Sequence, residues 1–139
     1  MAANITPIFV LKGNTKPARI AAANTASDGS GTLVTLVTAG ADGARVDGVR
    51  FRNSQVTAGI TSALVHRIFL SDTAGINPRL IGEVATATAT RSLTVVGATS
   101  IFTFDQPIIM LSGQIMSVVQ SIYTGVGDQF DACAFAGDY

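Results

Sequence analysis

The segment TLVTLVTAGADGARVDGVRFR, residues 32–52, decides the fold class of this chain. It starts with Thr32 to Thr38, a run of Thr, Leu and Val in which apolar residues at both odd and even positions predict a strand covered on both faces. Residues 39–43 follow and contain Asp42-Gly43, a pair that supplies the positive φ angles of a tight turn. We therefore predict a β-hairpin over residues 32–53.

The second strand of this segment, residues 45–52, predicts a β-bulge. Val46 is out of phase with Val49 and Phe51, and one extra residue at Asp47-Gly48 restores the phase. Because side chains alternate along a strand, the arginines beyond the bulge are expected on the outer surface. These are Arg50 and Arg52.

Short runs rich in Thr, Val and Ile continue through the rest of the chain, separated by turn residues about every ten positions, and no convincing helical period appears. We predict eight strands, over residues 18–23, 32–38, 45–52, 62–70, 80–90, 100–105, 114–123 and 129–136. This pattern indicates an all-β fold, an antiparallel β-sandwich that is jelly-roll-like. One domain, residues 17–139, accommodates it.

Three of these regions carry more specific expectations. Residues 62–70 have apolar side chains on both faces, which predicts a central, doubly covered strand. Residues 85–90 alternate Ala and Thr, so a neighbouring sheet or subunit must pack closely against the alanines. Residues 124–128 are rich in Gly and are expected to join the last two strands as a hairpin.

The first 16 residues differ from the rest and are predicted to form an extended arm. The arm is apolar up to a polar break at residues 12–17, and an exposed apolar segment of this kind would be an aggregation hazard. We expect it to add to a sheet edge or dock in a groove, on its own domain or on a neighbour. Its expected partner-binding residues are Ile5, Ile8, Phe9, Val10 and Leu11.

The composition favours assembly with other proteins. Hydrophobic residues make up 47% of the chain and charged residues only 13%, and a nearly neutral surface with few charges promotes association. The alternative is a compact domain whose outer face is covered by Thr, Ser, Asn, Gln and Ala. Residues 1–91 carry a net charge of +4 and residues 92–139 carry −4, so the two halves can pair within the fold or between subunits.

Overall neutrality argues against nucleic acid as the main partner, because phosphate binding requires a clustered basic surface. Arg45, Arg50 and Arg52 are close together but too few for that purpose, and they are candidate subunit contacts. Residues 106–127 lack charge, yet polar residues interrupt them too often for a membrane span. No secretory signal is visible, so we expect synthesis in the cytoplasm of the producing cell.

The inventory of reactive side chains predicts neither an enzyme nor a metal or cofactor site. His66 is the single histidine and Cys133 the single cysteine, which are too few for a zinc site or a catalytic pair. We expect His66 to be a hydrogen-bonded structural residue and Cys133 a small buried hydrophobe. Glu83 is the only glutamate, and the aspartates beside turn residues are expected to close those turns.

Several segments resemble small virion proteins encoded among the structural genes of tailed bacteriophages. They are Ala23-Asn24-Thr25, Asp28-Gly29-Ser30-Gly31-Thr32, Thr38-Ala39-Gly40, Gly43-Ala44-Arg45-Val46-Asp47 and Val49-Arg50-Phe51, within a likeness that covers residues 22–72. The closing Gly137-Asp138-Tyr139 is also similar to the C-terminus of that group. The apolar arm and the uncharged region 106–127 depart from the family's pattern, which leaves the docking mode open.

The resemblance implies a capsid cement or decoration protein, a β-sandwich that binds the major capsid protein on the outer surface of the virion, often as a homotrimer. It carries over no catalytic residue, and it makes Arg45, Arg50 and Arg52 candidate capsid contacts. A tail-associated or fibre-associated virion protein is the nearest alternative. A carbohydrate-binding module is the alternative of another class, although such sites usually rely on exposed aromatic platforms and the chain has no tryptophan.

Overall fold

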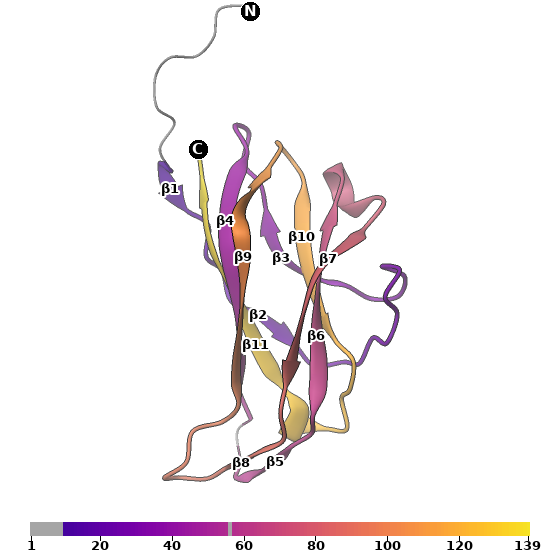
Figure 1. Cartoon of the computed structure of the whole chain (residues 1–139), viewed down its shortest axis with the longest axis vertical. Helices are drawn as coiled ribbons and strands as arrows, with labels where there is room; N and C mark the ends of the chain where they lie inside the picture. The colour runs from indigo at the N-terminus through magenta and orange to yellow at the C-terminus, as the bar shows by residue number, and fades with distance from the viewer. Residues whose placement is uncertain (1–9, 56) are drawn as a thin grey trace, which may run out of the picture.

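The computed structural model describes residues 10–55 and 57–139, and these residues form a β-sandwich (Figure 1). Short runs of β-branched and aromatic residues form the strands, and polar turns separate them. The strands are β1 (Lys12–Gly13), β2 (Ala18–Ile20), β3 (Val34–Thr38), β4 (Ala44–Asn53), β5 (Gly59–Thr61), β6 (Leu64–Ser71), β7 (Arg79–Thr86), β8 (Ala89–Arg91), β9 (Thr99–Met110), β10 (Ile115–Gln120) and β11 (Phe130–Asp138). Two short 3₁₀ turns, η1 (Thr73–Gly75) and η2 (Val126–Asp128), complete the elements.

The strands form a jelly roll, which is the predicted class of sandwich, and the structure supplies the strand order that the sequence left open. One sheet has the order β1-β11-β4-β9, with β2 also paired to β11, and the facing sheet has the order β3-β10-β6-β7. Strands that follow one another in the chain mostly lie in opposite sheets, which produces the two interleaved Greek keys of this fold. A small ribbon of β5 and β8 closes one end. In Figure 1 the two sheets stand side by side, with β4 and β9 in one and β6 and β10 in the other.

The core lies between the two sheets and is filled from their inward-facing positions. Val49 and Phe51 of β4 are fully buried, and so are Ile68 of β6 and Val118 of β10. Their buried area is the main source of stability, because each fully buried large apolar side chain contributes about 1.5–3 kcal/mol. The alternation along β4 leaves Arg50 and Arg52 exposed on the other side, as predicted.

The predicted bulge is present in β4. The ladder with β11 shifts register between Phe135 and Ala136, opposite Asp47, and the ladder with β9 shifts between Val46 and Gly48. A Cβ atom at Gly48 would lie 2.6 Å from the carbonyl oxygen of Phe102, so only glycine allows this close approach of the two strands.

Two predicted hairpins are wrong. The turn at 39–43 forms, and the Gly43 N–H donates to the Gly40 carbonyl oxygen at 3.1 Å, but β3 and β4 lie in different sheets. The connection through residues 124–128 likewise joins β10 and β11, which also lie in different sheets. In both places a tight turn carries the chain from one sheet to the other, since local turn chemistry does not specify which strands pair.

The predicted strand over residues 80–90 is also divided. β7 ends at Thr86, and Ala89 begins β8, which pairs with β5. The alternation places Thr86 inward, where its hydroxyl hydrogen bonds that of Ser100 at 2.7 Å, and leaves Ala85 exposed. The expected close packing by a neighbouring sheet is therefore wrong for Ala85 and Ala87, which are exposed, whereas Ala89 packs against the core. Packing of the exposed alanines against a subunit stays a prediction. Strand β6, which was predicted to be covered on both faces, is covered only in part on the second face, because Phe69 is buried there whereas Val65 and Arg67 are half-buried.

The described part of the predicted arm lies along the edge of its own domain. The Leu11 N–H donates to the Asp138 carbonyl oxygen at 2.8 Å, and the Asn14 N–H donates to that of Ala136 at 3.0 Å. Lys12 and Gly13 continue this antiparallel pairing with β11. Ile5, Ile8 and Phe9 lie outside the described residues.

Candidate docking face

The outer face of the sheet formed by β2, β11, β4 and β9 combines arginines with exposed apolar side chains. In one row across the strands, Arg19, Asp131 and Arg52 are register partners. In the next row, Cys133 pairs with Arg50, which pairs with Ile101. Because paired residues of a ladder point to the same side, each row presents its side chains on one surface. We call this surface the docking face.

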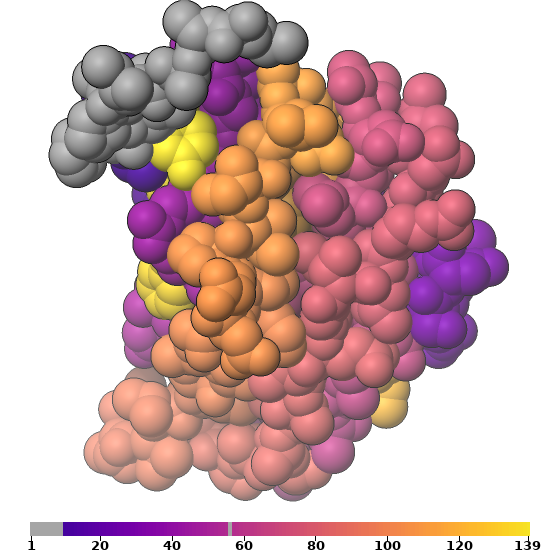
Figure 2. Space-filling model, turned by 45° about the horizontal axis from the view of Figure 1, so that its top comes forward, coloured from indigo at the N-terminus to yellow at the C-terminus, as the bar shows by residue number. Residues whose placement is uncertain are grey.

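The apolar part of the docking face continues beyond the bulge. Phe135 on β11 is 40% exposed, and Ile101 and Ile109 on β9 are 53% and 56% exposed. Val10 packs directly on Gly137, so closely that a Cβ atom added at position 137 would overlap the Cγ1 atom of Val10. Figure 2 shows the surface of β9, in orange, across the middle of the view.

The docking face combines residue types that are enriched in protein interfaces with two aspartates, Asp131 and Asp47, each of which is paired with an arginine. Aromatic residues and arginine are enriched in the centres of such interfaces, where lysine, glutamate and aspartate are depleted. On this face Arg45 pairs with Ile109 and Arg50 pairs with Ile101, and Phe135 lies opposite Gly48 between them. Exposed apolar residues gathered in this way mark sites of protein association more often than apolar residues scattered singly.

Four arginines surround a hollow of about 570 Å³ at the end of the docking face nearest the β5–β8 ribbon. They come from three strands that are far apart in the chain, β2, β4 and β8, and the hollow also borders the single cysteine. Its charged lining residues are Arg19, Arg50, Arg52, Arg91 and Asp131. We call it the arginine hollow.

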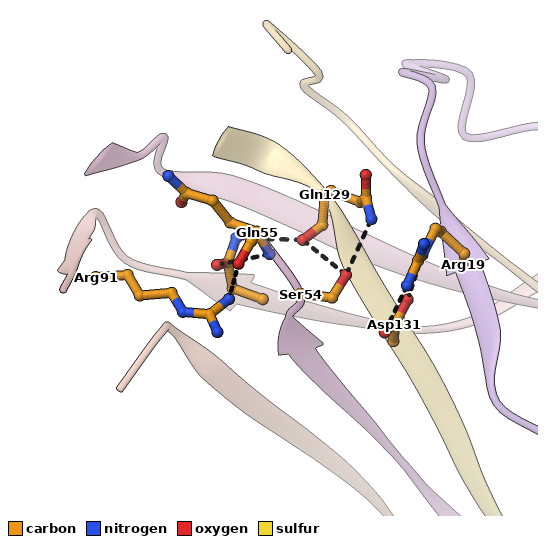
Figure 3. Close-up of polar contacts among 7 residues, drawn as sticks. Arg19, Ser54, Gln55, Arg91, Gln129 and Asp131 are labelled. Atoms are coloured by element: carbon orange, nitrogen blue, oxygen red, sulfur yellow. Dashed lines mark hydrogen bonds and ion pairs between the residues drawn. The ribbon is translucent and has the colours of Figure 1, made fainter. Parts of the chain in front are cut away.

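Polar contacts hold one wall of the arginine hollow (Figure 3). The Arg91 guanidinium donates to the Gln55 carbonyl oxygen, and the Ser54 N–H donates to that of Gln129 at 2.8 Å. The Asn53 amide donates to the Gly127 carbonyl oxygen at 2.8 Å. The residues that end β4 are thereby joined to the segment before β11.

Two of the arginines of the docking face are engaged in ion pairs. Arg19 Nε lies 3.0 Å from Asp131 Oδ1, and this hydrogen bond and charge raise the pKa of the arginine. Arg45 Nη2 lies 2.7 Å from Asp47 Oδ1, with the same effect on its pKa. The Arg19 pair joins the basic and the acidic halves of the chain within the fold, which is one of the two arrangements the charge pattern left open.

A second, apolar hollow lies on the opposite sheet. It measures about 520 Å³ and is lined by residues at the ends of β6, β7 and β10, including Ala63, Ala85, Ala87 and Ile122. Ala85 and Ala87 are exposed in it. A partner molecule would bury these small side chains.

The candidate contact residues from the sequence are only partly brought together. Arg50 and Arg52 line the arginine hollow, whereas Arg45 lies beyond the bulge beside Asp47. Among the arm residues, Val10 contacts the docking face and Leu11 is 82% exposed. Sequence reasoning missed Arg19 and Arg91, because they join Arg50 only through strand pairing and loop placement, which leave no local signal.

His66 is buried in the core, and the prediction that it is hydrogen-bonded is wrong. Its ring stacks on Phe51 with centroids 4.1 Å apart and meets the edge of Phe130 at 4.6 Å. Neither ring nitrogen has a hydrogen-bond partner among the described residues. Burial lowers the pKa of His66 to about 3, so the ring is neutral and serves as a core aromatic group.

The prediction for Cys133 is wrong, since its parity on β11 places it half-exposed beside Arg50 rather than in the core.

The turn role expected of Asp128 is confirmed. Its buried carboxylate accepts hydrogen bonds from the N–H and hydroxyl groups of Ser62 and Thr124, at 2.6–3.1 Å. Burial alone would raise the pKa of Asp128, but these hydrogen bonds lower it below its ordinary value.

Within residues 10–55 and 57–139, no group of three or more His, Cys, Asp or Glu side chains is arranged to hold a metal ion. The same residues contain no helix long and apolar enough to cross a membrane. No protein-family model matches the chain, and no curated protein matches it.

Proposed function

We propose that this protein is a non-enzymatic structural protein of a bacteriophage virion, a capsid cement or decoration protein that binds the outer surface of the major capsid protein shell and stabilises it. The observation that carries the proposal is the docking face, on which arginines and exposed apolar side chains alternate over the strands of a rigid sheet. A sheet suits docking, because its backbone is already ordered and only its side chains lose conformational entropy on binding.

The fold and the resemblance of residues 22–72 support the same proposal. Jelly rolls are common in viral capsid proteins, but they also occur in lectins, so fold alone does not decide between assembly and sugar binding. Sugar binding usually requires an exposed aromatic platform. Phe135 is the one exposed aromatic residue of the docking face, and it is only 40% exposed. Assembly is therefore the better supported function.

Self-association as a homotrimer completes the proposal. The apolar hollow around Ala85 and Ala87 provides a surface for contact between copies, separate from the docking face. Residues 1–9 provide a further apolar segment, with Ile5, Ile8 and Phe9. Light scattering coupled to size-exclusion chromatography measures the state directly, and a monomer at high concentration contradicts the trimer.

Cryo-electron microscopy and mass spectrometry of the virion test the location. We expect the protein in many copies on the head, bridging neighbouring capsid subunits through its docking face. Detection only in the tail favours the tail-associated alternative, and absence from the particle overturns both. Binding on a glycan array without binding to capsids favours a carbohydrate-binding module instead.

Deleting residues 1–9 tests the arm, because this change leaves every described hydrogen bond between the first strand and β11 in place. We expect the shortened protein to fold and to bind capsids more weakly. Unchanged capsid binding and an unchanged oligomeric state would show that Ile5, Ile8 and Phe9 play no part in assembly.

A further inference from the structure

We infer that the arginine hollow is a binding site for an acidic segment of a partner protein, a short peptide with two or more carboxylates next to an apolar side chain. This inference goes beyond the proposed function, because it concerns the chemistry of the ligand and holds whichever protein supplies the segment. It rests on the charge, the shape and the surroundings of the hollow.

The charges around the hollow are unbalanced. Arg19, Arg50, Arg52 and Arg91 face a single acidic residue, Asp131, which leaves a formal excess of three positive charges. Asp131 pairs with Arg19. Among the described residues, no carboxylate lies within ion-pair distance of Arg50 or Arg52, and both are exposed. These two guanidinium groups are therefore available to a ligand.

The spacing of the available arginines suits carboxylates. Arg50 and Arg52 lie two residues apart on one face of β4, so their Cα atoms are separated by about 6.5–7 Å. Each guanidinium presents parallel N–H groups that match the two oxygens of one carboxylate. Acidic side chains at alternate positions of an extended peptide have the same separation, so such a peptide laid along β4 would pair both arginines at once.

Two of the four arginines have partners before any ligand arrives. Arg91 is fixed by its hydrogen bond to the Gln55 carbonyl oxygen, and Arg19 by its two contacts with Asp131 at 3.0 and 3.4 Å. Figure 3 shows these two fixed arginines on opposite sides of the contacts made by Ser54. These two arginines therefore lose little entropy when a ligand binds, whereas Arg50 and Arg52 become ordered by their pairing with its carboxylates.

An apolar loop beside the hollow favours a peptide over a nucleic acid. Arg52 and Arg91 also line a smaller hollow of about 240 Å³, whose other wall is the segment from Ser92 to Gly97. This loop exposes Leu93 fully and Val96 to 75%, and both would contact an apolar side chain of the ligand. A phosphate backbone needs an extended basic track, whereas Asp47 and the isoleucines of β9 interrupt the positive charge along the docking face.

Cys133 supplies a built-in reporter, because it lines the hollow and is the only cysteine of the chain. The experiment follows the rate at which an uncharged thiol reagent modifies Cys133 in the full-length protein. Three probes are compared: a peptide with alternating Glu and Leu, the same peptide with neutral Gln in place of Glu, and a single-stranded oligonucleotide with the same number of negative charges as the acidic peptide. Fluorescence anisotropy of the labelled peptides gives their affinities.

We expect the acidic peptide alone to bind and to slow the modification of Cys133. Arg50→Glu combined with Arg52→Glu should lower its affinity at least about tenfold, since each removes a charge-assisted pair and adds repulsion. The matched control is Arg79→Glu, which changes an exposed arginine on β7 of the other sheet and should leave the affinity unchanged. Raising the salt concentration should weaken binding.

Each remaining outcome overturns the inference. Protection of Cys133 by the oligonucleotide and not by the acidic peptide identifies a polyanion site of another class. Protection by no probe identifies a solvated arginine surface that takes no ligand. An equal loss of affinity in the Arg79→Glu variant shows that net charge, and not the hollow, attracts the peptide. None of these outcomes depends on whether the protein is found on a capsid.

Discussion

The two sides of strand β4 differ in what covers them, because other parts of the chain pack on the inner side and leave the outer side exposed. On the inner side, Val49 and Phe51 are fully buried, and Phe51 stacks on His66. On the outer side, Arg50 and Arg52 are exposed beside Ile101, with no described segment of the chain lying over them. The inner side therefore holds the fold together, whereas the outer side contributes little to folding and is open to a partner.

This difference predicts that substitutions on the inner side of β4 change stability, whereas substitutions on the outer side change binding. Changes on the inner side should lower the free energy of unfolding because they leave cavities or unpaired polar groups in a close-packed interior. Changes on the outer side should leave the free energy of unfolding almost unchanged and act on association.

The largest expected effect is on the inner side, at Phe51. Phe51→Ala removes a ring that is fully buried and should lower the free energy of unfolding by about 3–5 kcal/mol. Urea denaturation followed by circular dichroism measures it, with Arg52→Ala on the same strand as the control. A loss below about 1 kcal/mol would mean that the two sides of β4 do not differ as described.

A smaller loss is expected at Asp128, at the end of the core. Asp128→Ala leaves the N–H and hydroxyl groups of the half-buried Ser62 and the exposed Thr124 without the acceptor that the buried carboxylate provides and should cost about 2–3 kcal/mol. The control is Asp105→Ala, which removes an exposed aspartate. If the two variants unfold at the same urea concentration, the hydrogen bonds to Asp128 contribute nothing.

The third effect concerns pH and again lies on the inner side. The pKa of His66 is about 3 in the folded protein and near 6.5 in the unfolded chain. The unfolded chain thus binds more protons between these values, so the free energy of unfolding should fall as the pH drops below 6.5, by about 2 kcal/mol between pH 7 and pH 5.

Thermal unfolding at a series of pH values measures this dependence, and His66→Leu is the matched variant because its side chain does not titrate. We expect the variant to lose most of the decline between pH 7 and pH 5. An equally steep decline in the variant would assign the effect to other groups.

The smallest effect is expected on the outer side. Arg50→Ala should change the free energy of unfolding by less than about 0.5 kcal/mol, because its side chain is exposed and pairs with no carboxylate of the described residues. The same denaturation experiment tests it. A loss above 1 kcal/mol would show that the docking face also holds the sheet together.

Much of the fold could be predicted because it depends on local patterns. Alternation along residues 45–52 predicted the exposed arginines, and the phase change at Asp47-Gly48 predicted the bulge. Turn residues predicted where each strand would end. The pairing of strands could not be read in this way, since the Asp42-Gly43 turn serves equally well for a hairpin within one sheet and for a crossing between two sheets.

The candidate site was predicted less completely for the same reason. Arg50 and Arg52 share a strand, so their common face follows from the alternation of β4. Arg19 reaches that face only because β2 pairs with β11, and Arg91 only because its side chain reaches the Gln55 carbonyl oxygen. The exposure of Cys133 depended likewise on the register of β11 against β4.

The amino-acid sequence thus determined the all-β class, the bulge, the neutral charge and the scarcity of reactive side chains, because each of these depends on residue type and near neighbours. The tertiary structure alone decided the jelly-roll strand order, the unpaired burial of His66 and the gathering of four arginines around one hollow. These features arise from contacts between residues more than 100 positions apart in the chain, and local propensity carries no information about such contacts.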